Sequence, residues 1–275
     1  MGDAMTFHMK YPVTPRYLTA PSKRRSGIKM AGAVRFVVAH DTGNEGSTAA
    51  NNVAYYERSR DEISASAHIF VDDKAILECV PALTAEPEKA WHVRYDVQMD
   101  DKLYGRQAND AAIGVEYCFG SNIDADEAYR RYVWVIAYIC FKFQLNPATS
   151  VTGHFILDPA RKTDPVTGLA RSRRTYDQLL ADIVAEYQEC TGNAGQFLVA
   201  GVREETGTVT TTVTLNLRRG APTTRAPVAG VVMPGQTVSY VGVTDSGDRV
   251  DGISRWYRDA GDCFFWAGGV MAAGT

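Results

Sequence analysis

Residues that could hold a metal ion and act on an amide lie in two short segments of the chain. His154, Lys162 and Asp164 stand within eleven residues of one another, and His40 follows the apolar run 34–39. Histidine and aspartate both bind zinc, and three protein ligands leave a fourth position open for water, as in catalytic zinc sites. A lysine beside such a site can stabilise an oxyanion as it forms. The pattern therefore predicts a catalytic Zn2+ held by His40, His154 and Asp164.

Each of these residues alone is weakly informative. A lone histidine at a strand end is more often structural, and an aspartate before a proline is commonly a turn residue. The combination says more, because metal-assisted amide hydrolysis also needs a carboxylate that takes a proton from the metal-bound water. Glu116, near the end of the apolar segment 112–118, suits that task. With Lys162 as the cation near the oxyanion, these residues fill the roles of that reaction.

The hydrophobic pattern predicts the elements that must position these residues. In the first ~190 residues, short β-branched runs alternate with amphipathic segments, which is typical of an α/β fold. Strands are expected at 34–39, 67–71, 75–80 and 112–118, and helices at 47–58, 126–143 and 175–191. Ser47 is the expected cap of the first helix. Residues 1–32 are expected to form an extended surface arm, and the aromatic side chains of helix 126–143 are expected to pack internally.

The pattern changes toward the C-terminus. Short Val- and Thr-rich runs alternate there with Gly, Pro and Asp turns, which indicates a small all-β barrel. Strand-like pieces are expected at 209–217, 230–233, 237–243, 255–258 and 263–266. The sequence therefore predicts a catalytic domain over 1–192, a linker over 193–206 and a second domain over 207–275.

Composition narrows the possible classes of protein. The 275 residues are 45% hydrophobic and 22% charged, as in ordinary folded domains, and the net charge of −3 gives no reason to expect nucleic-acid binding. We expect no secretory signal and no membrane span, hence synthesis in the cytoplasm. Five cysteines without C-x-x-C spacing are expected to be reduced, packed thiols. They are Cys79, Cys118, Cys140, Cys190 and Cys263.

Five separated motifs together resemble a known family. They are His40 after its apolar run, SAHIFVDD at 66–73, AWH at 90–92, IGVE at 113–116 and GHFILDPARKTDP at 153–165. Over roughly residues 33–190, their order resembles the zinc-dependent N-acetylmuramoyl-L-alanine amidases of the amidase-2 type, which are related to peptidoglycan recognition proteins. The resemblance implies a central mixed sheet flanked by helices, with zinc in a groove that binds peptidoglycan. It also implies cleavage of the amide between N-acetylmuramic acid and L-alanine.

The resemblance assigns a role to each matching residue. It implies that His40, His154 and Asp164 bind zinc, and that Lys162 steadies the transition state. Many relatives have a tyrosine where this chain has Ala67, so the resemblance leaves the proton transfer to Glu116.

Other histidines and a tryptophan also match the family pattern. The AWH motif implies that Trp91 and His92 lie beside the groove, where substrate contact and packing are equally open. His68 is expected to be structural, or to lie behind the metal ligands, and His8 to lie on the surface.

The C-terminal residues resemble bacterial SH3-type domains. The segments 213–222, 228–238, 255–257 and 264–267 match the motifs of that family, although Phe265 replaces a usual glycine. Such domains bind cell-wall peptides or glycans, and the resemblance makes Trp256, Tyr257 and Trp266 the aromatic candidates for that contact. In a barrel this small, some aromatic residues must instead form the core.

The two resemblances together predict a peptidoglycan hydrolase, of the kind that a phage or prophage uses as an endolysin and releases through a holin. The alternatives are a cytoplasmic muropeptide-recycling amidase, which has no need for wall targeting, and a non-catalytic peptidoglycan-binding protein. The oligomeric state stays open.

Overall fold

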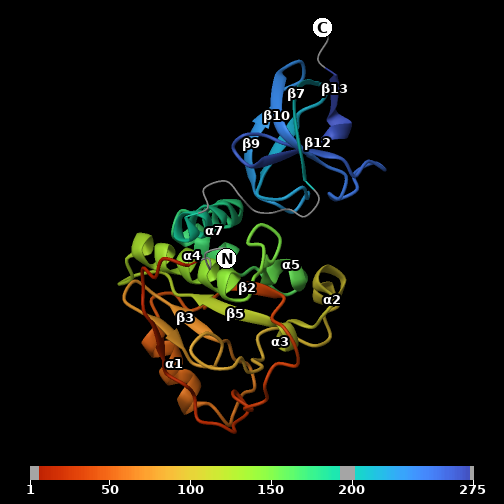
Figure 1. The fold of residues 1–275 in the computed structure, drawn as a ribbon. Helices are drawn as coiled ribbons and strands as arrows, with labels where there is room; N and C mark the ends of the chain where they lie inside the picture. The colour runs from red at the N-terminus through yellow and green to blue at the C-terminus, as the bar shows by residue number, and fades with distance from the viewer. Residues whose placement is uncertain (1–5, 193–201, 273–275) are drawn as a thin grey trace. The chain divides into compact units, whose positions relative to one another are not determined.

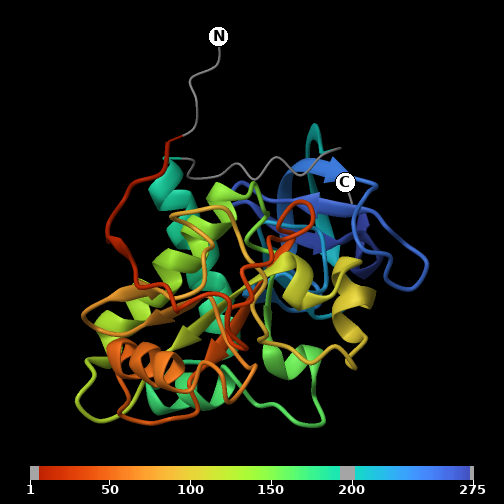
Figure 2. The ribbon, with the colours of Figure 1, turned by 90° about the horizontal axis from the view of Figure 1, so that it is seen from below.

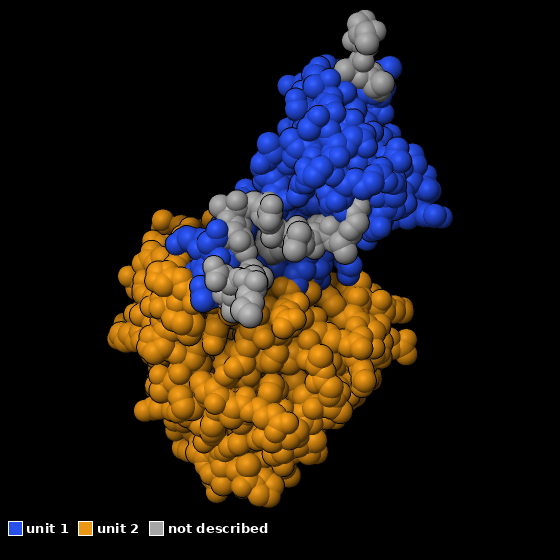
Figure 3. Space-filling model, viewed as in Figure 1, with its two compact units in different colours: residues 1–6, 146–149, 180–275 blue, residues 7–145, 150–179 orange. Residues whose placement is uncertain are grey.

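The computed structural model describes residues 6–192 and 202–272, which divide into two compact units (Figure 3). Unit 2 comprises residues 7–145 and 150–179, and unit 1 comprises residues 1–6, 146–149 and 180–275. The boundary falls within a continuous helix, α7 (Tyr176–Thr191), which matches the helix expected at 175–191. No helix among the described residues is long and apolar enough to cross a membrane.

Unit 2 is built on a mixed six-stranded sheet. Its order is β1 (Val13–Pro15), β4 (Ile76–Glu78), β3 (Ile69–Val71), β5 (Ala112–Tyr117), β2 (Phe36–Asp41) and β6 (Val151–Gly153). The strands β3, β5, β2 and β6 are neighbours in this order and run parallel to one another, while β4 is antiparallel to β3. Every residue of β2 is buried, because helices cover both faces of the central strands. The mixed sheet expected from the sequence is confirmed.

The longest helices of this unit lie on opposite faces of the sheet. Figures 1 and 2 show α4 (Ala125–Lys142) on one face and α1 (Ala49–Arg58) on the other. The N-terminal cap of α1 is Thr48 rather than the expected Ser47, because the Thr48 side chain accepts from the backbone N–H of Asn51. The remaining short helices are α2 (Met99–Tyr104), α3 (Ala108–Ala111), α5 (His154–Leu157) and α6 (Val166–Arg171).

The aromatic residues of α4 pack internally, as expected. Trp134 is fully buried and contacts the rings of Phe7 and Tyr11 from the N-terminal segment. Tyr132 is also buried, and its hydroxyl donates to the carbonyl of His40 over 2.9 Å. The helix therefore holds the end of β2 in place. The N-terminal segment is more than a surface arm, since its strand β1 extends the sheet beside β4.

Unit 1 contains an antiparallel seven-stranded sheet, which confirms the all-β expectation. Its order is β13 (Val270–Ala272), β7 (Arg203–Thr211), β10 (Thr237–Thr244), β11 (Trp256–Arg258), β12 (Cys263–Trp266), β8 (Leu215–Arg219) and β9 (Val228–Val232), with a 3₁₀ turn, η1 (Ala267–Gly269), before β13. Side chains from every strand join one core around Val209, Leu215 and Phe265, so the sheet curls around a common interior.

Two sequence expectations for this part differ from the structure. The single strand expected at 209–217 is two strands, β7 and β8, because the chain turns at 212–214. Residues 193–201 of the expected linker lie outside the described residues, and residues 203–206 belong to β7.

One buried carboxylate, at the end of β4, stabilises the turn that follows this strand of the six-stranded sheet. Glu78 is fully buried, and its carboxylate accepts backbone hydrogen bonds from Ala82, Leu83 and Thr84. We predict that Glu78→Ala lowers the free energy of unfolding by about 3 kcal/mol, because it leaves buried donors without an acceptor. Urea denaturation measures the change. Glu78→Gln keeps an acceptor oxygen, so its free energy of unfolding should fall by less than half as much. Equal midpoints for Glu78→Ala and the unmodified protein would contradict the prediction.

Candidate metal centre and active-site pocket

Three adjacent parallel strands bring the predicted site residues to one edge of the sheet. The register of β2 and β5 pairs His40 with Glu116, so both side chains lie at the carboxyl ends of their strands. On the other side of β2, Ala39 pairs with Gly153, and His154 follows β6 directly. The carboxyl ends of parallel strands are the usual place for binding sites in α/β sheets.

The segment after His154 folds back and adds the third predicted ligand. The backbone N–H of Phe155 donates to the carbonyl of Asp164 over 3.0 Å, which closes this loop. The Oδ2 atom of Asp164 then lies 2.9 Å from Nδ1 of His40 and 3.1 Å from Nδ1 of His154. One ligand atom from each residue lies within 4.8 Å of the other two. Two imidazoles and a carboxylate at this spacing fit a zinc ion.

The charge states of these groups favour a cation. Burial lowers the pKa of His40 to about 4, and this effect outweighs the hydrogen bond to Asp164. Burial opposes the charge of Asp164, but hydrogen bonds from His154 and His40 hold its pKa well below the usual range. At neutral pH the His40–Asp164 contact is therefore a hydrogen bond from a neutral imidazole to a carboxylate. A neutral imidazole and an ionised carboxylate are the forms that bind metal.

Glu116 lies beside the ligands with one oxygen unsatisfied. It lines the same pocket as His40, His154 and Asp164, and its buried Oε2 has no hydrogen-bond partner among the described residues. Burial raises the pKa of Glu116 well above its usual value, and the nearby Asp164 charge adds to the effect. A carboxyl group with a raised pKa can both accept and return a proton near neutral pH, as general acid–base catalysis requires.

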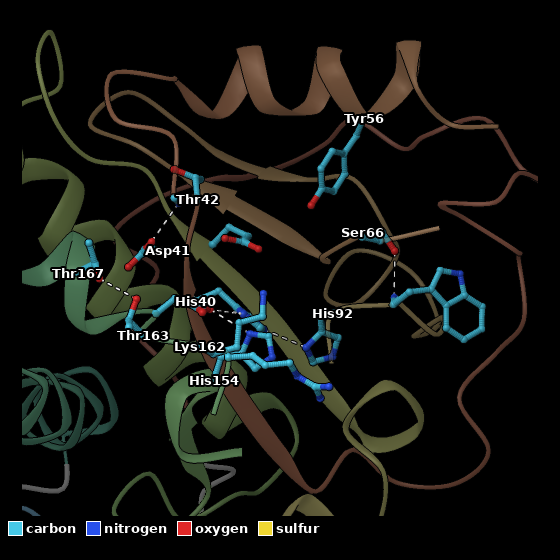
Figure 4. A pocket seen from close by; sticks show the side chains of 16 residues that line it. His40, Asp41, Thr42, Tyr56, Ser66, His92, His154, Lys162, Thr163 and Thr167 are labelled. Atoms are coloured by element: carbon cyan, nitrogen blue, oxygen red, sulfur yellow. Dashed lines mark hydrogen bonds and ion pairs between the residues drawn. The ribbon is translucent and has the colours of Figure 1, made fainter. Parts of the chain in front are cut away.

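The pocket is open to a substrate and bordered by the other predicted residues. Figure 4 shows this cavity of about 340 Å³, which an adjoining cavity of about 600 Å³ extends. Lys162, Trp91 and His92 line both cavities. Trp91 is half-buried, and its backbone N–H donates to Ser66 Oγ. Figure 4 also shows the hydrogen bond between the rings of His92 and His40, in which Nδ1 of His92 lies 3.1 Å from Nε2 of His40.

His68 stands apart from the ligand group. It is fully buried, its Nδ1 accepts from the N–H of Gly114, and its Nε2 donates to the carbonyl of Glu88. Both ring nitrogens are therefore committed to the backbone, which agrees with the structural role expected for it.

The structure adds two pocket residues that the sequence reasoning did not assign. Asp41 ties the site together, since its carboxylate accepts from the backbone N–H groups of Gly43 and Gly168. Tyr56 on α1 lines the pocket, and its ring packs against Phe70. Asp41 follows the predicted ligand His40 directly, which is a signal in the sequence, whereas nothing in the sequence marks Tyr56.

The aromatic residues predicted to contact the cell wall differ in exposure. Trp256 is 2% exposed and its indole N–H donates to the carbonyl of Asp248, so this ring packs inside unit 1. Tyr257 and Trp266 keep part of their side chains accessible. The structure therefore contradicts a surface contact for Trp256.

Comparisons with known proteins agree with this architecture. The catalytic domain of XlyA is 24% identical with a TM-score of 0.50, covering 62% of this chain and 99% of that one. A mutant endolysin from Bacillus subtilis is 22% identical with a TM-score of 0.50, covering 63% and 99%. The hydrolase AmiA of Staphylococcus aureus, in complex with its ligand, is 22% identical with a TM-score of 0.53, covering 67% and 88%. These likenesses show a shared fold.

The family comparison is more specific. The search of curated proteins found no match to this sequence. The N-acetylmuramoyl-L-alanine amidase family matches residues 30–167, which is half of the chain and includes His40, Glu116, His154, Lys162 and Asp164. The chain therefore belongs to the N-acetylmuramoyl-L-alanine amidase family.

Proposed function

We propose that this protein is a zinc-dependent peptidoglycan amidase that cleaves the bond between N-acetylmuramic acid and L-alanine. The observation that carries the proposal is the convergence of His40, His154 and Asp164 at the edge of an open pocket, in a chain of the amidase family. Glu116 and Lys162 line the same pocket, so an acid–base group and a cation stand beside the ligands.

The roles of the side chains follow from their chemistry. Zinc at the three ligands would lower the pKa of a bound water and polarise the scissile carbonyl. Glu116 takes the proton of the attacking water on its unsatisfied oxygen and returns it to the leaving amine of L-alanine. Lys162 stabilises the negative charge on the tetrahedral carbon's oxygen. Trp91 borders both cavities and contacts the substrate beside the scissile bond.

We assign cell-wall binding to the C-terminal part of the chain. Its SH3-type sequence motifs support this assignment, and Tyr257 and Trp266 are the partly exposed aromatic residues among those motifs. A catalytic domain in the N-terminal part of the chain, joined to a binding domain whose first strand is β7 from Arg203, keeps a high local concentration of enzyme at the polymer. This pairing favours a phage or prophage endolysin over a muropeptide-recycling amidase, since soluble fragments require no tether.

The reaction is tested by mass spectrometry of digested peptidoglycan. We expect the protein to release peptides with a free L-alanine amino terminus and to leave the glycan intact. Removing the metal with a chelator should abolish release, and added Zn2+ should restore it. Unchanged peptidoglycan, from protein that holds zinc and binds the wall, would indicate a non-catalytic binding protein instead. Activity on soluble muropeptides but not on intact walls would favour the recycling amidase.

The ligand assignment is tested by the zinc content of variants. We predict that Asp164→Ala reduces bound zinc from about one ion per chain to about a tenth, because two imidazoles alone hold zinc poorly. Elemental mass spectrometry of dialysed protein measures the content. Asp177→Ala, at an exposed position in α7, is the matched control and should retain the full amount. Full zinc in Asp164→Ala would remove Asp164 from the ligand set.

The catalytic roles of Glu116 and Lys162 are tested by the turnover numbers of their variants. We predict that Glu116→Gln lowers kcat about 10²–10⁴-fold through loss of proton transfer. Lys162→Met should lower kcat about 10²–10³-fold through loss of oxyanion stabilisation. Both variants should keep their zinc, as should the controls Glu62→Gln and Lys102→Met at exposed positions. A variant that loses activity only together with its zinc would refute the catalytic role of that residue.

A further inference from the structure

We propose that His92 is a positioning residue that fixes the orientation and the tautomer of the metal ligand His40. The proposal rests on the proposed zinc site. The two rings lie nearly at right angles, with a centroid distance of 5.2 Å and an angle of 84°. Nε2 of His40 lies 3.1 Å from Nδ1 of His92, and both side chains are buried.

The two nitrogens of His40 face different partners. Nδ1 points to Asp164, and Nε2 points to His92. A cation bound at Nδ1 leaves the imidazole proton on Nε2, so this N–H needs an acceptor. Histidine ligands of metals generally donate that proton to a fixed group, which sets the ring orientation and raises ligand basicity. Here the available acceptor is Nδ1 of His92.

The hydrogen bond between His40 and His92 can also form without a cation, and the donor and the acceptor then exchange roles. The Nδ1–H of His40 then donates to the Asp164 carboxylate, and Nε2 of His40 accepts a hydrogen bond from the Nδ1–H of His92. Metal binding thus requires only that the proton of each neutral ring moves to the other nitrogen. The contact between His40 and His92 is therefore available in both states, so it orients His40 before the ion binds.

The surrounding chain fixes His92 itself. Oδ1 of Asn109 accepts the backbone N–H groups of His92 and Val93, each over 3.0 Å, and Nδ2 of Asn109 donates back to the Val93 carbonyl. On β5, Gly114 leaves room for the ring, because a Cβ there would lie 2.8 Å from Cγ and Nδ1 of His92. The AWH and IGVE motifs therefore meet at this ring.

The remaining nitrogen of His92 argues against a merely packed ring. Nε2 is buried and has no hydrogen-bond partner among the described residues, although His92 lines both cavities. A buried donor without a partner is costly, and an apolar ring would avoid that cost. When Nδ1 accepts from His40, the proton of the His92 ring stands on Nε2.

The test compares two substitutions of His92 by their zinc affinity, measured by competition with a chromophoric chelator. His92→Phe keeps an aromatic ring and removes the acceptor, and we expect it to bind zinc about 10–100-fold more weakly. His92→Asn places Oδ1 near the position of Nδ1, and we expect it to regain most of that affinity. Zinc affinity of His92→Phe equal to that of the unmodified protein would overturn the proposal.

A second variant acts on the same ring from the sheet. Gly114→Ala displaces His92 without changing its atoms, and we expect it to weaken zinc binding as well. Gly230→Ala in β9 is the matched control, because its Cβ would meet only Leu217 at an ordinary 3.6 Å. Urea denaturation of the zinc-free proteins identifies variants that merely fail to fold, and affinities are compared only among variants that unfold like the original.

The outcomes separate this proposal from the proposed function. An unmodified protein that binds no zinc would overturn both. Zinc binding by the unmodified protein with equal affinity in His92→Phe and Gly114→Ala would overturn the positioning role alone. A raised KM in His92→Phe with unchanged zinc affinity would overturn it too, since His92 would then act only on the substrate. Weaker zinc binding in His92→Phe and Gly114→Ala, together with recovered affinity in His92→Asn, supports the positioning role of His92.

Discussion

The site depends on one carboxylate oxygen that two histidines share. Oδ2 of Asp164 accepts from His40, at the end of a central strand, and from His154, at the start of a short helix ten residues before it. The loop that carries Lys162 is closed at the same place, because the backbone N–H of Phe155 donates to the carbonyl of Asp164. Burial lowers the pKa of His40 and so keeps its imidazole neutral, and burial also costs the Asp164 carboxylate part of its solvation. A cation at this oxygen would take the place of the two hydrogen bonds.

The parallel sheet supplies the geometry that this oxygen completes. The register of β2 and β5 places His40 and Glu116 side by side. His154 lies at the same edge of the sheet, because it directly follows β6, the other neighbour of β2. Asp41 then joins the strand end to α6 through the N–H of Gly168, at a place where a Cβ would lie 2.8 Å from Asp41. Rigid strands hold one side of the pocket, and backbone hydrogen bonds hold the loops of the other.

Much of this arrangement was predictable because it is encoded locally. The strand that ends at His40, the strand that carries Glu116 and the helix over 126–143 have continuous or periodic apolar patterns, and the order of the motifs indicated the ligands. The strands β1 and β6 were not predicted, because each has three residues and owes its conformation to a partner strand. The contact between His40 and His92 joins residues 52 apart in sequence, and no local pattern reports such a pair.

The burial of the cysteines affects how the protein responds to the redox potential of the solution. All five cysteines are buried and none forms a disulfide, and burial raises the pKa values of Cys79, Cys118, Cys140 and Cys263. Thiols that stay protonated and covered exchange slowly with disulfides and oxidants. The fold therefore relies on no disulfide among these cysteines, and their burial slows the formation of one when the protein passes from a reducing to an oxidising solution.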